Sequence, residues 1–338
     1  MPKISLVVLN WNGKQHLEPC FNSINEQTYK DFETLLVDNG SNDGSVELVK
    51  EKFPWVKIIS LPKNIGFPCG NNEGIKRTNG EYVLTLNNDT KLDKDTLKNL
   101  MEVAEKNPKV GMFSLKMVFF YEPNLINSTG TLVYKDGSAI NRGMKKEDEG
   151  QFEQVEEILG PCAGAALYKK EMLEDIKHGE DEYFDKHFWI YLEDTDLSLR
   201  AQLNGWKAMY VPNSIIHHVH SATMIAKSPM KLYLSERNRI WYTIKAFPLP
   251  LLLKTPYHTV KRYLKIAKNL KKSTEGKNSY KKSEFIKALI KAWAVGLIFI
   301  PRAIKKRRIV QKNKKITNKE FYNLIEKHSA TTEDIINS

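Results

Sequence analysis

Three acidic clusters, each placed directly after an apolar run, constrain the fold of this chain more than any other feature. Glu33–Val37 and Tyr82–Leu86 are short, apolar and rich in β-favouring residues, which predicts two buried strands. Asp38 and Asp89 follow these two runs, and Glu193–Asp196 follows a third apolar stretch. Carboxylates at strand ends lie at the carboxyl edge of a sheet, where open α/β folds bind their ligands. Because an unpartnered buried carboxylate is costly, the clusters indicate a bound cation or polar ligand, and hence an enzyme.

Short apolar runs alternate with amphipathic stretches throughout residues 1–110. The runs predict strands at Ile4–Leu9, Phe32–Val37, Lys57–Leu61 and Tyr82–Leu86. The amphipathic stretches between them predict helices at Lys14–Glu26, Ser45–Lys52, Gly70–Thr78 and Lys94–Lys106. Strands and helices that alternate at this spacing imply an α/β fold with a mostly parallel sheet and helices on both faces.

Residues 111–245 are less regular. The pattern predicts strands at Gly111–Phe120, Thr131–Tyr134 and Tyr210–Ile216, a loop over Asn141–Glu157, and a helix from about Asp194 to Leu203. Beyond residue 245 apolar and basic residues recur at helical spacing. We therefore divide the chain into a body, 1–245, with halves 1–110 and 111–245, and a helical segment, 246–338.

Charge separates these two parts. Residues 246–338 contain 22 Lys+Arg and 6 Asp+Glu, a net charge of +16. Residues 1–245 contain 30 Lys+Arg and 34 Asp+Glu, a net charge of −4. A mildly acidic body thus carries a strongly basic extension, and the two are best interpreted separately.

Cysteine usage and hydropathy predict a cytoplasmic location. Three scattered cysteines, Cys20, Cys69 and Cys162, argue against a disulfide framework and fit a reducing compartment. The first strand begins at Ile4, which leaves no room for a signal-peptide core before it. No apolar run approaches the roughly 18 residues that a membrane-spanning helix needs.

Two of the acidic clusters also have ordinary structural interpretations. Asp38–Ser45 is typical of a turn and helix cap, although Asp38 could accept a hydrogen bond from a nucleotide base. Asn87-Asn88-Asp89 is typical of a polar turn, but it could also hold Mg²⁺ or Mn²⁺ together with diphosphate oxygens.

The third cluster, Glu193–Asp196, is equally open. It could be the acidic first turn of a helix, or one carboxylate could be a general base that deprotonates an acceptor hydroxyl. In the helical interpretation Arg200 lies one turn from Asp196 and pairs with it.

Three histidines, His217, His218 and His220, follow the predicted strand Tyr210–Ile216. Alternate residues of a strand share a face, so His218 and His220 point away from His217. One of the three could complete a metal site begun by Asp89.

Taken in order, these motifs resemble the inverting family 2 glycosyltransferases, which have a GT-A fold. The resemblance covers residues 4–245 and is carried by seven motifs: Val7–Gly13, Val37–Ser41, Asn64–Phe67, Leu86–Thr90, Gly160–Ala166, Glu193–Arg200 and His217-His218. Arg237–Trp241 and the basic extension are similar to the rhamnosyltransferase-like branch. The Gln-x-x-Arg-Trp motif of processive members is absent, which implies transfer of a single sugar.

The resemblance implies a role for each matching residue. Leu9, Trp11, Asp38 and Gly66 would bind the nucleotide, and Asn88 and Asp89 would lie at its ribose and diphosphate. Asp89 and His218 would hold Mg²⁺ or Mn²⁺, with Asn87 at a position where the family often has an acid. Asp194 would be the general base, and Glu193 would help to orient the acceptor. The donor would be a UDP- or dTDP-sugar, with dTDP-rhamnose favoured.

The basic extension has three possible partners. Ser283–Pro301 is apolar and meets the basic cluster Arg302–Arg308, a pattern that suits a helix lying in the interface of an anionic membrane. A helix packed against the body is the alternative. Nucleic-acid binding is disfavoured, because few aromatic residues interleave with the lysines and no recognition motif is present.

These features together predict a glycosyltransferase at the inner face of the cell membrane, acting on a lipid-linked or cell-surface glycan precursor. Two alternatives stay open at this point. One is a catalytically inactive sugar-nucleotide binding module at the membrane, and the other is a sugar nucleotidyltransferase.

Overall fold

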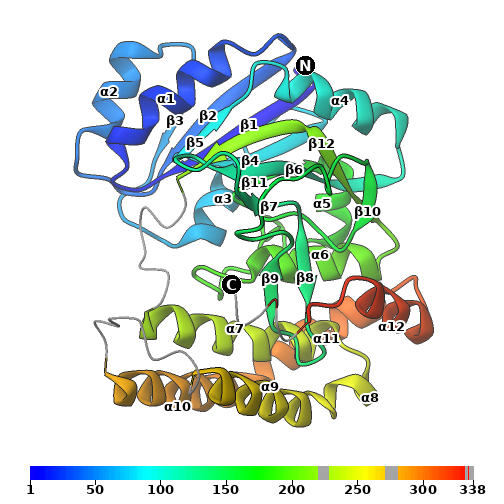
Figure 1. Cartoon of the computed structure of the whole chain (residues 1–338). Coiled ribbons are helices and arrows are strands. Elements are labelled where there is room, and N and C mark those ends of the chain that lie inside the picture. Colours follow the sequence, from blue (N-terminus) through cyan, green and yellow to red (C-terminus); the bar gives the residue numbers. More distant parts are fainter. Residues whose placement is uncertain (220–227, 271–280, 332–333, 335–338) are drawn as a thin grey trace.

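One large mixed sheet forms the centre of the molecule (Figure 1). The computed structural model describes residues 1–219, 228–270, 281–331 and 334. The strands in chain order are β1 (Ile4–Asn10), β2 (Phe32–Asp38), β3 (Lys57–Ser60), β4 (Tyr82–Asn87), β5 (Thr90–Leu92), β6 (Val110–Phe119), β7 (Ile126–Ser128), β8 (Thr131–Val133), β9 (Ala139–Asn141), β10 (Glu156–Ile158), β11 (Ala165–Lys169) and β12 (Lys207–His218).

Twelve helices are described around this sheet. They are α1 (Lys14–Asn25), α2 (Ser45–Lys52), α3 (Phe67–Ile75), α4 (Thr96–Lys106), α5 (Lys170–Ile176), α6 (Glu193–Leu203), α7 (Pro229–Ala246), α8 (Leu249–Leu252), α9 (Thr255–Leu270), α10 (Lys282–Ile298), α11 (Ile300–Lys312) and α12 (Asn318–Lys327).

The sheet order is β10-β12-β6-β11-β4-β1-β2-β3, with β5 on β12 and β7 on β6. Strands β3, β2, β1 and β4 run parallel, and β6 and β12 are parallel to each other. Between these two groups β11 is antiparallel to both neighbours. The mostly parallel sheet predicted from the sequence is therefore confirmed.

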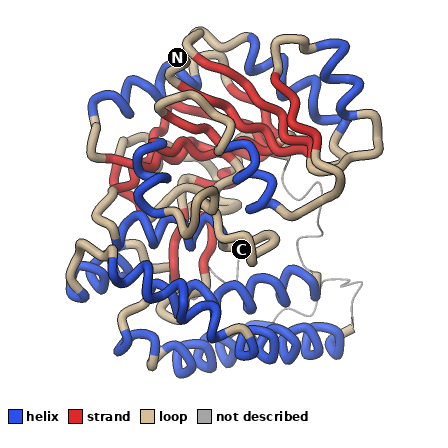
Figure 2. The backbone as a smooth tube through the Cα atoms, turned by 180° about the vertical axis from the view of Figure 1, so that it is seen from behind, coloured by secondary structure: helices blue, strands red, loops and turns tan. Residues whose placement is uncertain are grey.

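Alternating residues of β1 divide the core into two layers. Leu6 and Val8 pack on one face with residues of α1 and α4, whereas Val7 packs on the other face with residues of α3, α5 and α6. The period of two along a strand produces this division. Helices thus cover both faces, as predicted (Figure 2).

Most predicted elements of the body are present, with small shifts at their ends. The helix predicted at Gly70–Thr78 begins earlier, at Phe67, because Gly66 has a φ of 86° and Pro68 occupies the first turn. Proline is well tolerated there, since its missing N–H has no partner within the helix. Strands β5, β7, β9, β10 and β11 were not predicted, and β10 begins within the stretch predicted as a loop.

The C-terminal helices form a layer on the side of the sheet occupied by α6 (Figures 1 and 2). They share a third core with the body, in which Phe188 and Leu199 meet side chains such as Trp241, Ala303 and Phe321. The helical C-terminal region predicted from the sequence is therefore present. The predicted boundary at residue 245 falls in the last turn of α7. Within the described ranges, no helix combines the length and hydropathy of a membrane-spanning segment.

Candidate active site

The strand ends that carry the first motifs meet at one edge of the sheet. Asn10 is the register partner of Asp38, and Leu9 is the register partner of Asn87. The carboxyl ends of β1, β2 and β4 therefore lie side by side, as expected for an α/β ligand site.

Asn10 links these three strand ends through its side chain. Its Nδ2 donates to Asp38 Oδ1 at 2.9 Å, and its Oδ1 accepts from Asn88 Nδ2 at 2.5 Å. The second Asp38 oxygen accepts from the Ser41 N–H at 3.0 Å, and Asp38 is almost fully buried. Asn10 is not among the predicted site residues. It lies within the motif Val7–Gly13, but neither that motif nor its place at the end of an apolar run predicts this role.

The other predicted nucleotide residues surround this network. Trp11 follows Asn10 and is 41% exposed, so its ring is available to a ligand. Leu9 lies against Gly70 of α3, where a Cβ atom would be 2.5 Å from Leu9 Cδ1. Gly66 has a left-handed backbone, and a Cβ atom there would be 2.9 Å from the Trp189 carbonyl oxygen. Both glycines thus permit close contacts that a side chain would prevent.

Asp89, between β4 and β5, lies next to His218 at the end of β12. Their Oδ1 and Nε2 atoms are 3.2 Å apart, and both side chains are buried. Burial alone would raise the pKa of Asp89, but the hydrogen bond and charge of His218 hold it below its ordinary value. His217 instead pairs with Asp93 near the surface, at 3.0 Å, and His220 lies outside the described residues.

The orientation of His218 suits a metal ligand. Its Nδ1 lies 3.0 Å from Asn127 Oδ1, which can only accept, so Nδ1 carries a proton. Its Nε2 faces Asp89 Oδ1 at 3.2 Å, and Asn87 Nδ2 lies 3.5 Å from the same nitrogen. Asp89 supplies a carboxylate and His218 an imidazole, which the Asn127 amide orients. These two ligands fit a divalent ion that takes its other ligands from a diphosphate and water.

Asp194 is the second residue of α6 and is half-buried. Its Oδ2 accepts from the Ala163 N–H at 3.2 Å and its Oδ1 from the Thr195 N–H at 2.6 Å. Burial raises the pKa of Asp194 and outweighs these backbone hydrogen bonds, which act in the opposite direction. Glu193 is more deeply buried. Desolvation, with the neighbouring Asp194 charge, raises the pKa of Glu193 well above its usual range.

One short segment joins this carboxylate to the sheet edge. The Ala163 N–H donates to Asp194, and the carbonyl of the next residue, Gly164, accepts from the Asn87 N–H at 2.9 Å. Gly164 also lies close to the Asn87 side chain, since a Cβ atom there would be 3.4 Å from Nδ2. The structure therefore brings Asp194 and the Asn87–Asp89 segment to the same place, although more than 100 residues separate them.

Comparison with known proteins identifies the family of the chain. The family model for Glycosyl transferase family 2 matches residues 5–177, more than half of the chain. The chain belongs to glycosyl transferase family 2. The match ends before Asp194 and His218, so the placement of these two residues rests on the geometry described above.

Named relatives of this family 2 glycosyltransferase act in bacterial glycan synthesis. N-acetylglucosaminyl-diphospho-decaprenol L-rhamnosyltransferase of Mycobacterium tuberculosis is 22% identical over 269 residues, which cover 71% of this chain and 86% of the relative. Amylovoran biosynthesis glycosyltransferase AmsB of Erwinia amylovora is 25% identical over 288 residues, which cover 78% of this chain and 89% of AmsB. The sugar nucleotidyltransferase alternative finds no support among these names.

Solved structures confirm the GT-A fold. S. aureus TarS 1–349 in complex with UDP aligns with a TM-score of 0.51 and 18% identity, covering 95% of this chain and 91% of TarS 1–349. GalNAc-T7 with UDP, GalNAc and Mn²⁺ aligns with a TM-score of 0.58 and 15% identity, covering 72% of this chain and 48% of GalNAc-T7. At these identities the likeness shows the fold alone.

The segment that precedes Asp194 in this glycosyltransferase has an unusual backbone. Trp189, Tyr191 and Leu192 all have positive φ values, of 68°, 72° and 66°. Such conformations are costly for these residues and persist only where the surroundings impose them. Here Asn238 of α7 imposes them, because its buried Nδ2 donates to the carbonyls of Phe188, Ile190 and Tyr191.

The same segment presents an indole to the nucleotide side. The Trp189 carbonyl accepts from the Phe67 N–H at 2.7 Å, at the start of α3, and its side chain is 46% exposed. Neither Trp189 nor Asn238 is a predicted site residue. Asn238 falls in the segment that resembles the rhamnosyltransferase-like branch, but no local pattern reveals its partners.

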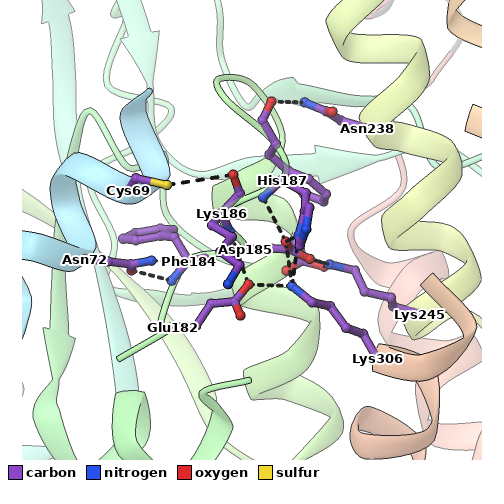
Figure 3. Close-up of polar contacts among 12 residues, drawn as sticks. Cys69, Asn72, Glu182, Phe184, Asp185, Lys186, His187, Asn238, Lys245 and Lys306 are labelled. Atoms are coloured by element: carbon purple, nitrogen blue, oxygen red, sulfur yellow. Dashed lines mark hydrogen bonds and ion pairs between the residues drawn. The ribbon is translucent and has the colours of Figure 1, made fainter. Parts of the chain in front are cut away.

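A second group of acidic residues lies between this segment and the C-terminal helices (Figure 3). Asp185 and Glu182 come close enough to His187 to suggest a metal site, as do Asp185 and Asp196 with His178. However, Lys245 and Lys306 contact Asp185 at 2.5 and 2.7 Å, Lys245 contacts Asp196 at 2.6 Å, and Lys306 contacts Glu182 at 2.5 Å.

The positive partners leave no need for a metal ion in this group. Arg200 also pairs with Asp196 at 3.0 Å, which confirms the pairing predicted from their spacing. Burial opposes ionisation of Asp185, but the nearby charge of Lys245 keeps the pKa of this carboxyl well below its ordinary value. Three carboxylates therefore face three cations, and the group is a buried ion network that anchors α7 and α11.

Proposed function

We propose that this family 2 glycosyltransferase is an inverting enzyme. It transfers one sugar from a UDP- or dTDP-sugar, with dTDP-rhamnose favoured, to a hydroxyl of a lipid-linked or cell-surface glycan precursor. The joining of Asp194 and Asn87 through Ala163 and Gly164 carries this proposal. In this proposal the base and the residues that hold the diphosphate would lie on the two sides of the transferred sugar.

In this mechanism one group of residues acts on the acceptor hydroxyl and another on the leaving diphosphate. Asp194 accepts the proton of the acceptor hydroxyl, and its raised pKa makes it a stronger base than an ordinary aspartate. The attacking oxygen approaches the anomeric carbon opposite the leaving diphosphate, so the configuration inverts. Asp89 and His218 would hold a Mg²⁺ or Mn²⁺ ion, which supplies positive charge for the leaving diphosphate.

On the donor side, Asp38 and Asn88 would fix the nucleoside, with Trp11 stacked on the base and Leu9 and Gly66 lining the site. The Asn10 network holds Asp38 and Asn88 in place before the donor arrives. This preorganisation lowers the entropy cost of donor binding.

Two similarities favour a rhamnosyl donor and a lipid-linked acceptor. The M. tuberculosis relative is named for L-rhamnosyl transfer to a diphospho-decaprenol substrate, and the present chain covers 86% of its length. We extend both the sugar class and the acceptor class to this chain as part of the proposal.

The C-terminal helices suit attachment to the inner face of the cell membrane. Helix α10 buries Ala288, Ala292 and Gly296 against the body, so the packed-helix alternative holds for this side. Its opposite side exposes Ile286, Ile290 and Leu297, each by more than half. Helix α9 lies in the same outer layer and likewise exposes apolar side chains beside lysines (Figure 1). Apolar surface flanked by lysines favours an anionic lipid surface, and we propose no nucleic-acid partner.

A thermal-shift panel tests the donor site directly. UDP, dTDP, GDP and ADP are each added with and without Mn²⁺ to the wild type and to His218→Ala, since a ligand of the native state raises its melting temperature. We expect stabilisation by UDP or dTDP that increases with Mn²⁺ only in the wild type. Equal stabilisation of both proteins by Mn²⁺ would exclude His218 as a ligand. No response to any nucleotide would instead support the inactive-module alternative.

A further inference from the structure

A pocket of about 210 Å³ opens where α7, α11 and the segment before α6 meet. Trp241, Phe299 and Ala303 form its apolar walls, and Lys245 and Lys306 lie at its polar end beside Asp185. Figure 3 shows both lysines reaching from their helices toward Asp185. None of the residues that line the pocket is a predicted nucleotide- or metal-binding residue.

Aromatic rings shape the apolar part of this pocket. Trp241 stacks on Phe188 with ring centres 6.2 Å apart and an angle of 28° between the planes. Phe299 meets Trp241 edge to face at 6.0 Å, and Ala303 leaves space beside it. Flat apolar walls of this kind accommodate a narrow hydrocarbon chain.

The two lysines that line the pocket are paired with carboxylates, whereas Arg302 has no such pairing within the described part of the chain. Lys245 and Lys306 are matched by Asp185, Asp196 and Glu182, with Arg200 as the third cation. Arg302 at the mouth is exposed, lies 4.8 Å over the Phe299 ring, and makes no ion pair with a carboxylate of the described residues. Its guanidinium is therefore a surplus positive charge, with the fork geometry that suits phosphate oxygens.

The pocket adjoins the exposed apolar side of α10 and the segment that precedes Asp194. Leu297 and Ile298, which directly precede Phe299, are 59% and 68% exposed. On the inner side, Phe188 packs on Trp241 and begins the strained segment that leads to Asp194. A prenyl chain that leaves the membrane along α10 would thus reach the pocket beside Phe299 and Arg302.

We infer that this pocket binds the prenyl diphosphate portion of the acceptor, with the first isoprene units against Trp241 and Phe299 and the diphosphate at Arg302. The inference rests on the proposed function, and it specifies the acceptor as a polyprenyl-diphosphate-linked glycan. Such a pocket holds the lipid end while the sugar end reaches Asp194.

Farnesyl diphosphate is the probe for this site. Its binding is measured by calorimetry on the full chain, with UDP or dTDP at saturating concentration so that the donor site is filled. Ala303→Phe fills the pocket and Arg302→Gln removes the surplus charge. Lys312→Gln is the matched control, because it removes an exposed charge at the far end of the same helix.

We expect Ala303→Phe and Arg302→Gln each to weaken binding by about tenfold, and Lys312→Gln to leave it unchanged. Farnesol and inorganic diphosphate test the chain and the anion separately, and both should bind more weakly than farnesyl diphosphate. Unchanged affinity in the first two variants would overturn the inference. Equal affinity for inorganic diphosphate would do the same, since it would reveal an anion site without a lipid component.

Two controls keep these outcomes separable. Arg302 is exposed, so Arg302→Gln tests the site even if Ala303→Phe fails to fold. Donor hydrolysis is measured on the same preparations. If both pocket variants bind farnesyl diphosphate as tightly as the wild type while the sugar nucleotide is hydrolysed normally, only the acceptor site is refuted. Absence of any UDP- or dTDP-sugar hydrolysis would instead refute the proposed function.

Discussion

The carboxyl edge of the sheet and the C-terminal helical layer hold buried polar groups in opposite ways. At the edge, one carboxylate is satisfied by neutral groups on adjacent strand ends, as when Asn10 joins Asp38 to Asn88. In the helical layer, whole ion networks are buried. Asp136 and Glu236 face Arg239 and Arg262, and Arg262 Nε contacts Asp136 Oδ2 at 2.8 Å across 126 residues of sequence.

This contrast suggests that the sheet edge serves catalysis and the helical layer serves stability. The edge groups keep unused capacity for a ligand, so their removal should impair function more than folding. The ions of the helical layer satisfy one another, and a single deletion there leaves an uncompensated buried charge. The following experiments test this division, from the largest expected effect to the smallest.

The largest effect should come from Asp194→Asn. The amide keeps the shape of the side chain but cannot accept the acceptor proton, so we expect kcat to fall by about 10²–10⁴-fold with donor affinity unchanged. Steady-state kinetics and nucleotide titration measure the two quantities. Asp181→Asn, at an exposed position, is the control. Near-normal turnover by Asp194→Asn would exclude this residue as the base.

Arg262→Met should produce the largest loss of stability. Burial opposes ionisation of Asp136, but Arg239 and Arg262 hold the pKa of this carboxyl below its ordinary value. Removal of Arg262 leaves Asp136 and Glu236 partly uncompensated, so we expect the free energy of unfolding to fall by about 3–5 kcal/mol. Urea denaturation measures this change. Arg308→Met, at an exposed site on α11, should change it by less than about 0.5 kcal/mol.

Comparison of Arg262→Met with Asp194→Asn tests whether the helical layer contributes to stability alone. At a temperature where Arg262→Met remains folded, its kcat should match the wild type, in contrast to Asp194→Asn. A large loss of kcat in folded Arg262→Met would show that the helical layer takes part in the chemistry.

Membrane attachment should depend on exposed apolar side chains of α10. Their substitution should therefore weaken attachment without changing the free energy of unfolding. Ile286 and Ile290 are 59% and 65% exposed on α10. The double change to Ser should reduce affinity for anionic vesicles at least tenfold, because burial of each side chain in lipid contributes about 1.5–3 kcal/mol. Vesicle co-sedimentation gives the affinity, and Tyr121→Ser, at a 77% exposed site on the body, is the control. Unfolding without loss of vesicle binding would favour a packing role.

The smallest effect concerns pH. Burial raises the pKa of Asp194, and the base must be ionised to act. As pH falls through this raised pKa, kcat/KM should fall, so the acid limb should lie above the range of an ordinary aspartate, about 3.9. A pH–rate profile measures the limb. An acid limb at or below the ordinary range would contradict the predicted environment of Asp194.

The nucleotide half illustrates how much local pattern determines. Alternating strand and helix signals predict parallel strands in this half, and the polar residues after each strand then fall at one edge because parallel strands end together. Asp38, Asn88 and Asp89 could be located in this way. The helix that begins near Asp194 and its pairing of Asp196 with Arg200 also follow from spacing along one helix.

Only the tertiary structure decided which distant residues complete the site. Asn127 orients His218, Ala163 and Gly164 join Asp194 to Asn87, and Asn238 holds the segment before Asp194. These contacts join residues that are 31 to 91 positions apart, and they leave no periodic trace in the sequence. The amphipathic pattern of α10 likewise showed an apolar side but not which side packs. The reason is physical: local propensity and periodicity act over one or two turns, whereas hydrogen bonds and ion pairs between elements depend on packing of the whole chain.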